Sequence, residues 1–468
     1  MLMANAPVTI SPGETKRPPA QSSLDGPLVS TLLRFAAPNL IQILVQSAVA
    51  IVEIFLVGRL GTDAVAGISV VFPIVTLLIG ITIVALGGAV ASAIARSLGA
   101  GDKSEAEALA LHAIIIAIVF GAISAAIFWT FDVVLYSALG VTGASLGQAI
   151  IYSNIFFGGS VSVWLLAVLT AIVRGTGDMV TAARIAIVRA TIGIPLAAAL
   201  IFGWGPIPAL GIAGSAIAML CYYSIGVVAL VVHLQSRRSI LHISLANVTL
   251  RWSLFERILK VGAISSLQIG VANLALVAVT GIVARFGTEA LAGYGLASRI
   301  ELLIFPVLLA FGVGTTTMVG TCVGAGLQER ARKVALVATG IGAIAFEAIG
   351  LIVALFASGL IGLFSKAPNV VLAGANYLHT VGPVYGFMGL SAILFAAYQG
   401  WGRMTAPFLT SLLRLGVAIL GGLVVVHSSK PQLGTMFVVI AGSTVLPALA
   451  LGLFFLLRPP QASSKRPS

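Results

Sequence analysis

Carboxyl side chains inside long apolar segments are the residues of this sequence best suited to chemistry. Glu53, Glu301 and Glu347 each stand within a run of mostly aliphatic residues. A charged side chain costs about 2.5–3.5 kcal/mol at the centre of a bilayer, so such a residue needs a partner or a role. Removal from water favours the neutral acid, which lets a carboxyl exchange protons near neutral pH. These residues are therefore candidates for binding a proton or another cation.

Glu53 ends a polar stripe that also contains Asn39, Gln42 and Gln46. Spacings of three, four and seven residues place all four side chains on one face of a helix. A polar stripe that ends in a carboxyl is what an ion site beside a water-filled cavity requires. The sequence thus predicts that the stripe lines a cavity and that Glu53 carries the coupling ion. The alternative role for Glu53 is a structural hydrogen bond between helices.

Glu301 is the second candidate for ion coupling. It lies two residues after Arg299, and residues at that spacing do not face each other on a helix, so each needs another partner. We expect both side chains to point into the helix bundle or a cavity. A structural pair with a neighbouring helix is the alternative for Glu301. For Glu347, which has only apolar neighbours in sequence, the role stays open.

Other polar side chains within apolar runs are candidates for lining a substrate path. For one of them, His379, hydrogen-bonded packing is the alternative to proton relay. Together with the stripe on the first run, the candidates are Gln268, Asn273, Arg299, Tyr377 and His379.

The composition predicts that these residues lie in a membrane. Of 468 residues, 59% are hydrophobic and 9% are charged, and the mean hydropathy is +1.11; soluble proteins carry about 25% charged residues. Twelve apolar runs are long enough to span a bilayer, and they lack the alternation of a barrel strand. We therefore predict an all-α integral membrane protein with twelve transmembrane helices. Soluble enzymes, disulfide scaffolds and disordered proteins are excluded.

Basic residues predict the orientation and exclude some partners. With both termini in the cytoplasm, the inner side holds 21 Lys and Arg residues and the outer side 4, as expected for a multi-pass protein of the inner (plasma) membrane. The net charge of +12 is spread singly over short loops, so no nucleic-acid partner is expected. We expect a monomer in the lipid bilayer. The predicted boundaries are 1–29 (disordered tail), 30–234 (first lobe), 235–253 (linker), 254–458 (second lobe) and 459–468 (tail).

The chain repeats itself at a shift of 225 or 226 residues. Tyr152 falls on Tyr377, Arg189 on Arg414, and Gln42 on Gln268. The segments 58–67 and 284–293 match, as do 174–179 and 399–404. Six runs per half is an even number, so both halves enter from the same side. The prediction is two pseudo-symmetric six-helix bundles forming a parallel repeat, with its axis along the membrane normal.

The repeated motifs resemble the multidrug and toxic compound extrusion (MATE) transporters. The resemblance covers roughly residues 30–455 and rests on 33–38, 57–67, 174–178, 286–295, 323–326 and 399–403. It implies two lobes around a central cavity that export cationic or amphipathic molecules in exchange for H⁺ or Na⁺. The family typically carries an acid, usually Asp, where this chain has Glu53. The Asn and Asp that some branches place on the fifth span, and the acid that another branch places on the seventh, are absent, which leaves the coupling ion open.

These observations predict an ion-driven antiporter that works by alternating access. No cofactor is expected besides the coupling ion, because motifs for ATP binding, zinc hydrolysis and nucleophilic catalysis are missing. One alternative is a lipid-linked oligosaccharide flippase, which would need a cationic cavity; Arg299 is the only arginine that we expect within a span and away from helix ends. The other alternative is a polytopic membrane enzyme, which would need a catalytic cluster that the sequence does not show.

Overall fold

The computed structural model describes residues 22–242, 250–458 and 460, and this part of the chain is helical throughout with no named strand. Eleven of its helical segments are long and apolar enough to cross a membrane, and a bent pair of helices makes up to twelve. The predicted fold class is therefore confirmed. Residues 1–21 of the expected tail lie outside the described residues. The remainder of that tail contains the short helix α1 (Ser22–Asp25) and the start of the next helix.

The first six spans form one lobe. They are α2 (Leu28–Gly58), α3 (Thr62–Ile79) continuing through a π-helical segment (Gly80–Gly87) into α4 (Gly88–Gly99), α5 (Lys103–Ala138), the bent pair α6 (Gly143–Gly158) and α7 (Ser160–Gly175), α8 (Met179–Phe202) and α9 (Gly211–Gln235).

The last six spans form the other lobe. They are α10 (Trp252–Ala284), α11 (Thr288–Gly324), α12 (Gln328–Leu355) followed by the short α13 (Ala357–Gly362), α14 (Pro368–Val381) joined by a 3₁₀ turn (Gly382–Val384) to α15 (Tyr385–Trp401), α16 (Thr405–Val426) and α17 (Leu433–Leu457).

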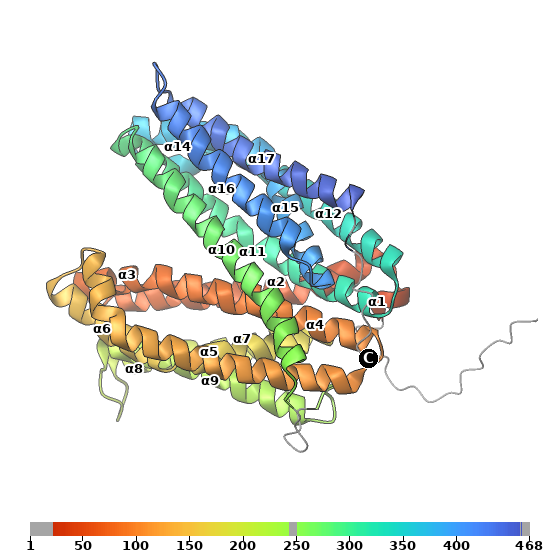
Figure 1. The fold of residues 1–468 in the computed structure, drawn as a ribbon. Helices are drawn as coiled ribbons and strands as arrows, with labels where there is room; N and C mark the ends of the chain where they lie inside the picture. Colours follow the sequence, from red (N-terminus) through yellow and green to blue (C-terminus); the bar gives the residue numbers. More distant parts are fainter. Residues whose placement is uncertain (1–21, 243–249, 459, 461–468) are drawn as a thin grey trace, which may run out of the picture.

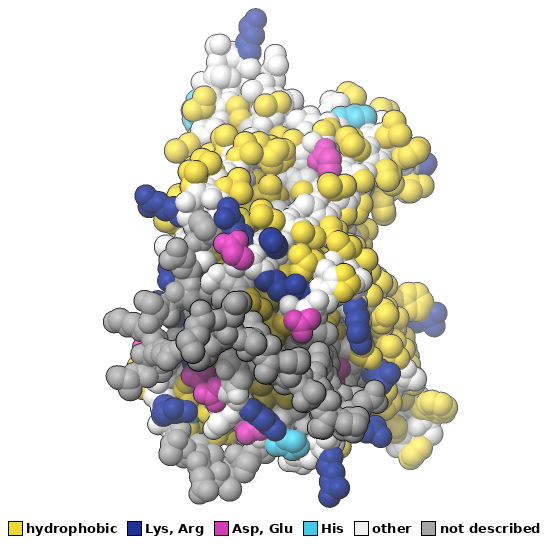
Figure 2. Space-filling view, turned by 90° about the vertical axis from the view of Figure 1, so that its right-hand side faces the viewer, with side chains coloured by type: hydrophobic (Ala, Val, Ile, Leu, Met, Phe, Trp, Pro, Cys, Tyr) yellow, Lys and Arg dark blue, Asp and Glu magenta, His cyan; other side chains and the backbone are white. Residues whose placement is uncertain are grey.

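The two lobes meet at one end and diverge at the other, so that the molecule has the outline of a V (Figure 1). The end where they meet carries the last turns of α4 and α11, and we call it the closed end. At the opposite, open end, the loops that follow α2 and α10 lie apart (Figure 1). Viewed from the closed end, the surface shows many Lys and Arg side chains and fewer acidic ones (Figure 2).

The closed end is built from glycine contacts that are nearly two-fold symmetric. A Cβ on Gly99 would collide with the carbonyl of Thr321, and a Cβ on Gly324 would collide with the carbonyl of Arg96. Both pairs of residues are related by the shift of 225, so α4 and α11 make the same contact in both directions. A contact of this kind is the mark of a two-fold axis. The axis passes near Gly320, whose added Cβ would lie 3.1 Å from the Cβ of Ala95, its equivalent at the same shift.

One span in each lobe is broken at equivalent positions. The axes of α6 and α7 meet at 49°, and the equivalent span is interrupted by the 3₁₀ turn before Tyr385. Backbone groups freed inside a membrane need partners. At the second break the Gly386 N–H finds one by donating to Glu347 Oε2 (2.8 Å), and at the first the Ser160 hydroxyl links the break to α5 by donating to the Gly121 carbonyl (2.8 Å). Glu347 thus accepts a hydrogen bond from the backbone at the second break.

The lobes are also joined near the linker. Arg257 at the start of α10 forms an ion pair with Glu105 at the start of α5, with 2.5 Å between Nη1 and Oε1. The backbone N–H of Arg251 donates to Nε2 of His112 on α5 (3.0 Å). The predicted linker corresponds to the segment between α9 and α10, of which residues 243–249 lie outside the described part. These contacts fix the second lobe against α5 at the closed end.

Candidate functional site

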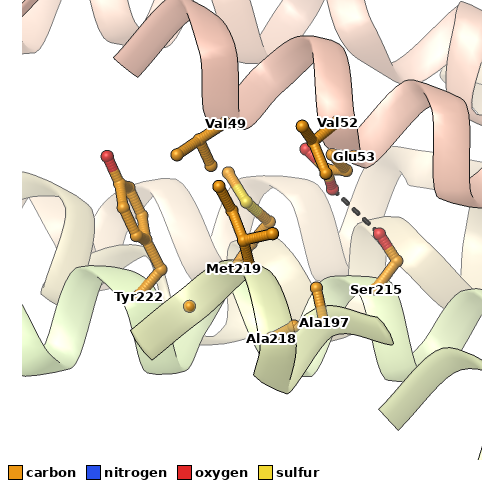
Figure 3. Close-up of a pocket in the computed structure, with 10 residues that line it drawn as sticks. Val49, Val52, Glu53, Ala197, Ser215, Ala218, Met219 and Tyr222 are labelled. Atoms are coloured by element: carbon orange, nitrogen blue, oxygen red, sulfur yellow. Dashed lines mark hydrogen bonds between the residues drawn. The ribbon is translucent and has the colours of Figure 1, made fainter. Parts of the chain in front are cut away.

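Glu53 lies in a small pocket inside the first lobe, between α2, α8 and α9. The Tyr152 hydroxyl of α6 (2.8 Å) and the Ser215 hydroxyl of α9 (2.9 Å) both donate to its Oε1 atom. Figure 3 shows Ser215 bonded to the carboxyl, with Tyr222 further along the same helix. The walls are otherwise aliphatic, formed by residues such as Val49 and Met219. Because both donors use Oε1, the second oxygen is left for a proton or a small cation.

The pocket explains why the polar stripe on the first span is divided. Gln42 and Gln46 face the space between the lobes, whereas Glu53, two to three turns further along α2, faces the interior of the first lobe. Asn39 is fully buried and its amide donates to the carbonyl of Phe35 (2.9 Å). The polar face of α2 therefore meets three environments: the buried packing around Asn39, the space between the lobes, and the interior of the first lobe. The neighbours of α2 change along its length.

Glu301 has a similar site in the second lobe. Its Oε1 accepts a hydrogen bond from the Tyr377 hydroxyl of α14 (3.1 Å), and Arg414 of α16 lies within electrostatic range. Tyr377 and Tyr152 are equivalent at the shift of 225, but the two acids are not, since Glu301 falls on Thr76. Each lobe thus pairs a carboxyl with the same tyrosine and takes the carboxyl from a different helix. The tyrosine repeat was visible in the sequence, but its pairing with the acids was not.

A cavity of about 570 Å³ lies between the lobes, and both contribute to its walls. Most of the wall is apolar, from residues such as Leu302, Phe305 and Met388. The polar part includes Gln42, Gln46, Gln268, Gln399 and three arginines, Arg174, Arg189 and Arg414. The described lining residues include no Asp or Glu. A concave, largely apolar space with a few polar groups is the usual form of a small-molecule site.

Three of the other residues predicted to line the substrate path lie elsewhere. Asn273 is exposed and donates to the carbonyl of Ile269 (2.9 Å), and His379 is exposed on α14. Arg299 is exposed on α11, next to exposed Leu302, and does not belong to the described cavity lining. The structure therefore does not include Arg299 in the cavity wall, although Leu302, about one turn further along α11, belongs to it.

The arginines of the cavity are the functional candidates that sequence reasoning missed. Arg189 and Arg414 lie well inside α8 and α16 and were assigned to the ends of spans. The expectation that Arg299 is the only arginine within a span and away from helix ends is thus wrong. A usable signal was present, because these two arginines occupy equivalent positions within apolar runs of the two halves. Arg174, at the end of α7, is equivalent to Gln399, which also lines the cavity.

Fold and site together define a polytopic membrane transporter, with two lobes around a central cavity and a partly buried carboxyl in each lobe. The MatE family model matches residues 38–199 and again residues 266–424, once in each half. The chain therefore belongs to the MatE family of multidrug and toxic compound extrusion transporters. Members of this family are transporters and not enzymes, and the resemblance seen in the sequence is confirmed.

Individual relatives agree with this assignment. The chain is 28% identical over 402 residues to the FAD transporter of Shewanella oneidensis, covering 85% of this chain and 88% of the relative. It is 24% identical to the probable multidrug resistance protein NorM of Thermotoga maritima, with 83% of each chain covered.

Solved structures share the fold. A transporter of the MOP superfamily from Pyrococcus furiosus, described as having a binding pocket of reverse polarity, matches with a TM-score of 0.87 at 22% identity, covering 96% of this chain and 99% of that one. An outward-facing multidrug resistance MATE family transporter matches with a TM-score of 0.85 at 23% identity, covering 94% and 97%.

Proposed function

We propose that this protein is an ion-gradient-driven antiporter that exports amphipathic small molecules across the plasma membrane by alternating access. The observation that carries the proposal is the combination of a cavity between two lobes with a carboxyl–tyrosine pair inside each lobe. The cavity holds the cargo, and the carboxyls exchange the coupling ion. H⁺ or Na⁺ serves as that ion, and the protein works as a monomer.

Orientation follows from the charge of the closed end. Lys and Arg side chains gather there, and the positive-inside rule assigns such a face to the cytoplasm (Figure 2). Both termini then lie in the cytoplasm, and the open end faces outward. The described conformation is accordingly the one that releases cargo to the outside and takes up the coupling ion.

The mechanism couples Glu53 to the cavity through α9. Ser215 binds the carboxyl, and Tyr222, two turns later on α9, contacts Arg189 of the cavity wall with 4.3 Å from its ring centroid to the guanidinium carbon. Binding of the coupling ion to Glu53 from outside neutralises the carboxylate to which Tyr152 and Ser215 donate hydrogen bonds. A shift of α9 against α2 then reaches Arg189, and the outward-facing state changes its affinity for cargo. An ion can shift the two states only through such a difference in binding.

The names of relatives supply two candidate cargoes. The Shewanella relative is called a FAD transporter and the Thermotoga relative a multidrug resistance protein. A lipid-linked oligosaccharide flippase is the second candidate function, and the arginines of the cavity wall favour it, since a pyrophosphate needs cations. A polytopic enzyme is set aside by family membership.

The decisive experiment is transport in proteoliposomes with the proton and sodium gradients imposed separately. Ethidium and FAD serve as cargo, and uptake of each is followed with inside-out protein. We expect one gradient to drive accumulation and a protonophore or sodium ionophore to abolish it. If cargo accumulates equally with and without either gradient, in vesicles with confirmed insertion, ion-driven antiport is overturned.

A further inference from the structure

The cavity between the lobes has a positive wall. Arg174, Arg189 and Arg414 line it, and the described lining residues include no Asp or Glu. A cationic cargo of the kind that the family resemblance implies would meet three like charges there. The wall is matched instead to a molecule that carries negative charge.

Two of these guanidinium groups are buried without a counter-ion. Arg174 is 6% exposed and Arg189 is 3% exposed. Arg174 donates to Gln42 Oε1 (3.0 Å), and its Nε atom has no hydrogen-bond partner. Nε and Nη1 of Arg189 also have none. Among the described residues, no carboxylate forms an ion pair with either side chain.

Such an arrangement is costly unless a ligand completes it. A buried charge that has no counter-charge and only some of its hydrogen bonds destabilises the protein. Both arginines contribute to the wall of the cavity, so a bound anion there lies beside two guanidinium groups that have no counter-charge. The planar guanidinium fork matches the oxygens of a phosphate group in a bidentate way.

The donors of the cavity are arranged in pairs across the lobes. Arg189 of α8 and Arg414 of α16 are equivalent at the shift of 225 and face the cavity from opposite lobes. Gln42 and Gln268 are equivalent at 226. Apolar side chains such as Phe305 and Phe395 fill the wall between these donors. A fitting molecule thus has a charged centre with apolar or aromatic parts beside it.

We propose that the cargo is an amphipathic phosphate or pyrophosphate ester. Arg174 and Arg189 bind its phosphate oxygens from the first lobe, and Arg414 balances the charge from the second. This inference rests on the proposed function, since it takes the cavity to be the transport site. The same chemistry occurs in a soluble dinucleotide and in a lipid-linked pyrophosphate, and the experiment separates these two sources.

The test measures binding to the purified full chain in nanodiscs without any ion gradient. The probes are FAD, riboflavin as the same ring without phosphate, ethidium as a planar cation, and a polyprenyl pyrophosphate as competitor. We expect FAD or the polyprenyl pyrophosphate to bind about tenfold or more tightly than riboflavin, and ethidium to bind weakest. Displacement of FAD by low concentrations of the lipid assigns the lipid source, and its failure assigns the soluble one.

Variants identify the residues that recognise the anion. Arg189→Gln and Arg414→Gln should each weaken binding of the phosphate ester about tenfold or more, because each removes a charged donor. Arg299→Gln is the matched control, since this arginine of α11 lies outside the cavity lining, and it should change nothing. If the buried Arg189 variant does not fold, the Arg414 variant and the probe series still decide.

Two results would overturn the inference: binding of ethidium above that of every phosphate-bearing probe, or anion affinity unchanged in Arg414→Gln. Gradient-driven transport of ethidium alone would uphold the antiport mechanism and contradict the anionic cargo. Tight binding of a phosphate ester with no ion-coupled transport would uphold the anionic cargo and contradict the antiport mechanism.

Discussion

A single oxygen of Glu53 holds together three helices. Tyr152 of α6 and Ser215 of α9 both donate to Oε1, so a proton on Oε2 leaves the two hydrogen bonds in place. Protonation therefore changes the charge at this point with little change in geometry. The change at Glu53 is therefore first a change of charge, and the proposed shift of α9 against α2 follows from it.

Glu53→Gln is expected to remove ion coupling and keep the fold. The amide oxygen can still accept from both hydroxyls, while the amide nitrogen imitates the protonated oxygen and cannot titrate. Gradient-driven efflux should fall to the level of empty membranes, with membrane expression and cargo binding near parental values. Glu347→Gln is the matched control, because its carboxyl accepts from the Gly386 N–H, a bond that Gln also makes. Parental efflux by a well-expressed Glu53→Gln protein would assign Glu53 to packing.

The sequence could identify the acids but not their partners. An acid inside an apolar run is conspicuous by its cost, so Glu53 and Glu301 were accessible to prediction. Tyr152 and Ser215 reach Glu53 from positions 99 and 162 residues away, and no local pattern encodes that approach. Arg189 was misplaced because it was counted with the basic residues of the inner side, although it lies within an apolar run.

Glycines also shape the chain at the open end, where α3 and α11 begin. Gly61 (113°) and Gly287 (107°), at equivalent positions of the two halves, adopt positive φ angles. Gly67 and Gly293 instead lie inside helices, where a Cβ would come within 2.9 Å of Ala149 N and 2.7 Å of Gly374 N. Small residues are needed in membrane proteins where two helix backbones pack closely, as well as in turns.

Gly324→Ala should destabilise the closed end. Its Cβ would collide with the carbonyl of Arg96 on α4, and overpacking of this kind costs about 1–3 kcal/mol. We expect lower thermal stability in detergent and slower efflux. Gly340→Ala on α12 is the control, because nothing lies within 4 Å of its added Cβ, and it should be neutral or slightly stabilising. Equal behaviour of the two variants would contradict the tight α4–α11 contact.

The ion pair between α5 and α10 is expected to bias the lobes toward closure at this end. Arg257→Ala removes the contact with Glu105, and a partly exposed pair contributes up to about 1 kcal/mol, or roughly a fivefold shift in population. Spin labels at Lys103→Cys and Glu329→Cys would report the separation of the lobes. Arg251→Ala is the control, because its contact with His112 comes from the backbone. A distance distribution identical in both variants would show that the pair is not part of the closure.

At the scale of the whole molecule, the proposed orientation predicts which side of the membrane reaches the cavity. Ser391→Cys places a thiol in the cavity wall, whereas native Cys322 is buried. In a Cys221→Ser background without gradients, a membrane-impermeant thiol reagent should label Ser391→Cys from outside cells and much less in inside-out vesicles. Labelling that is stronger in inside-out vesicles would place the open end in the cytoplasm.

The near-symmetry of the cavity has a consequence for how cargo sits in it. With Arg189 facing Arg414, an asymmetric anion can enter in either of two orientations related by the axis between α4 and α11. Two equal orientations are worth about 0.4 kcal/mol of entropy, which favours tolerance of varied cargo. The two orientations are not equal in energy, because the first lobe has Arg174 where the second lobe has the neutral Gln399. The substitution Gln399→Arg would add the missing cation to the second lobe and bring the two orientations closer in energy.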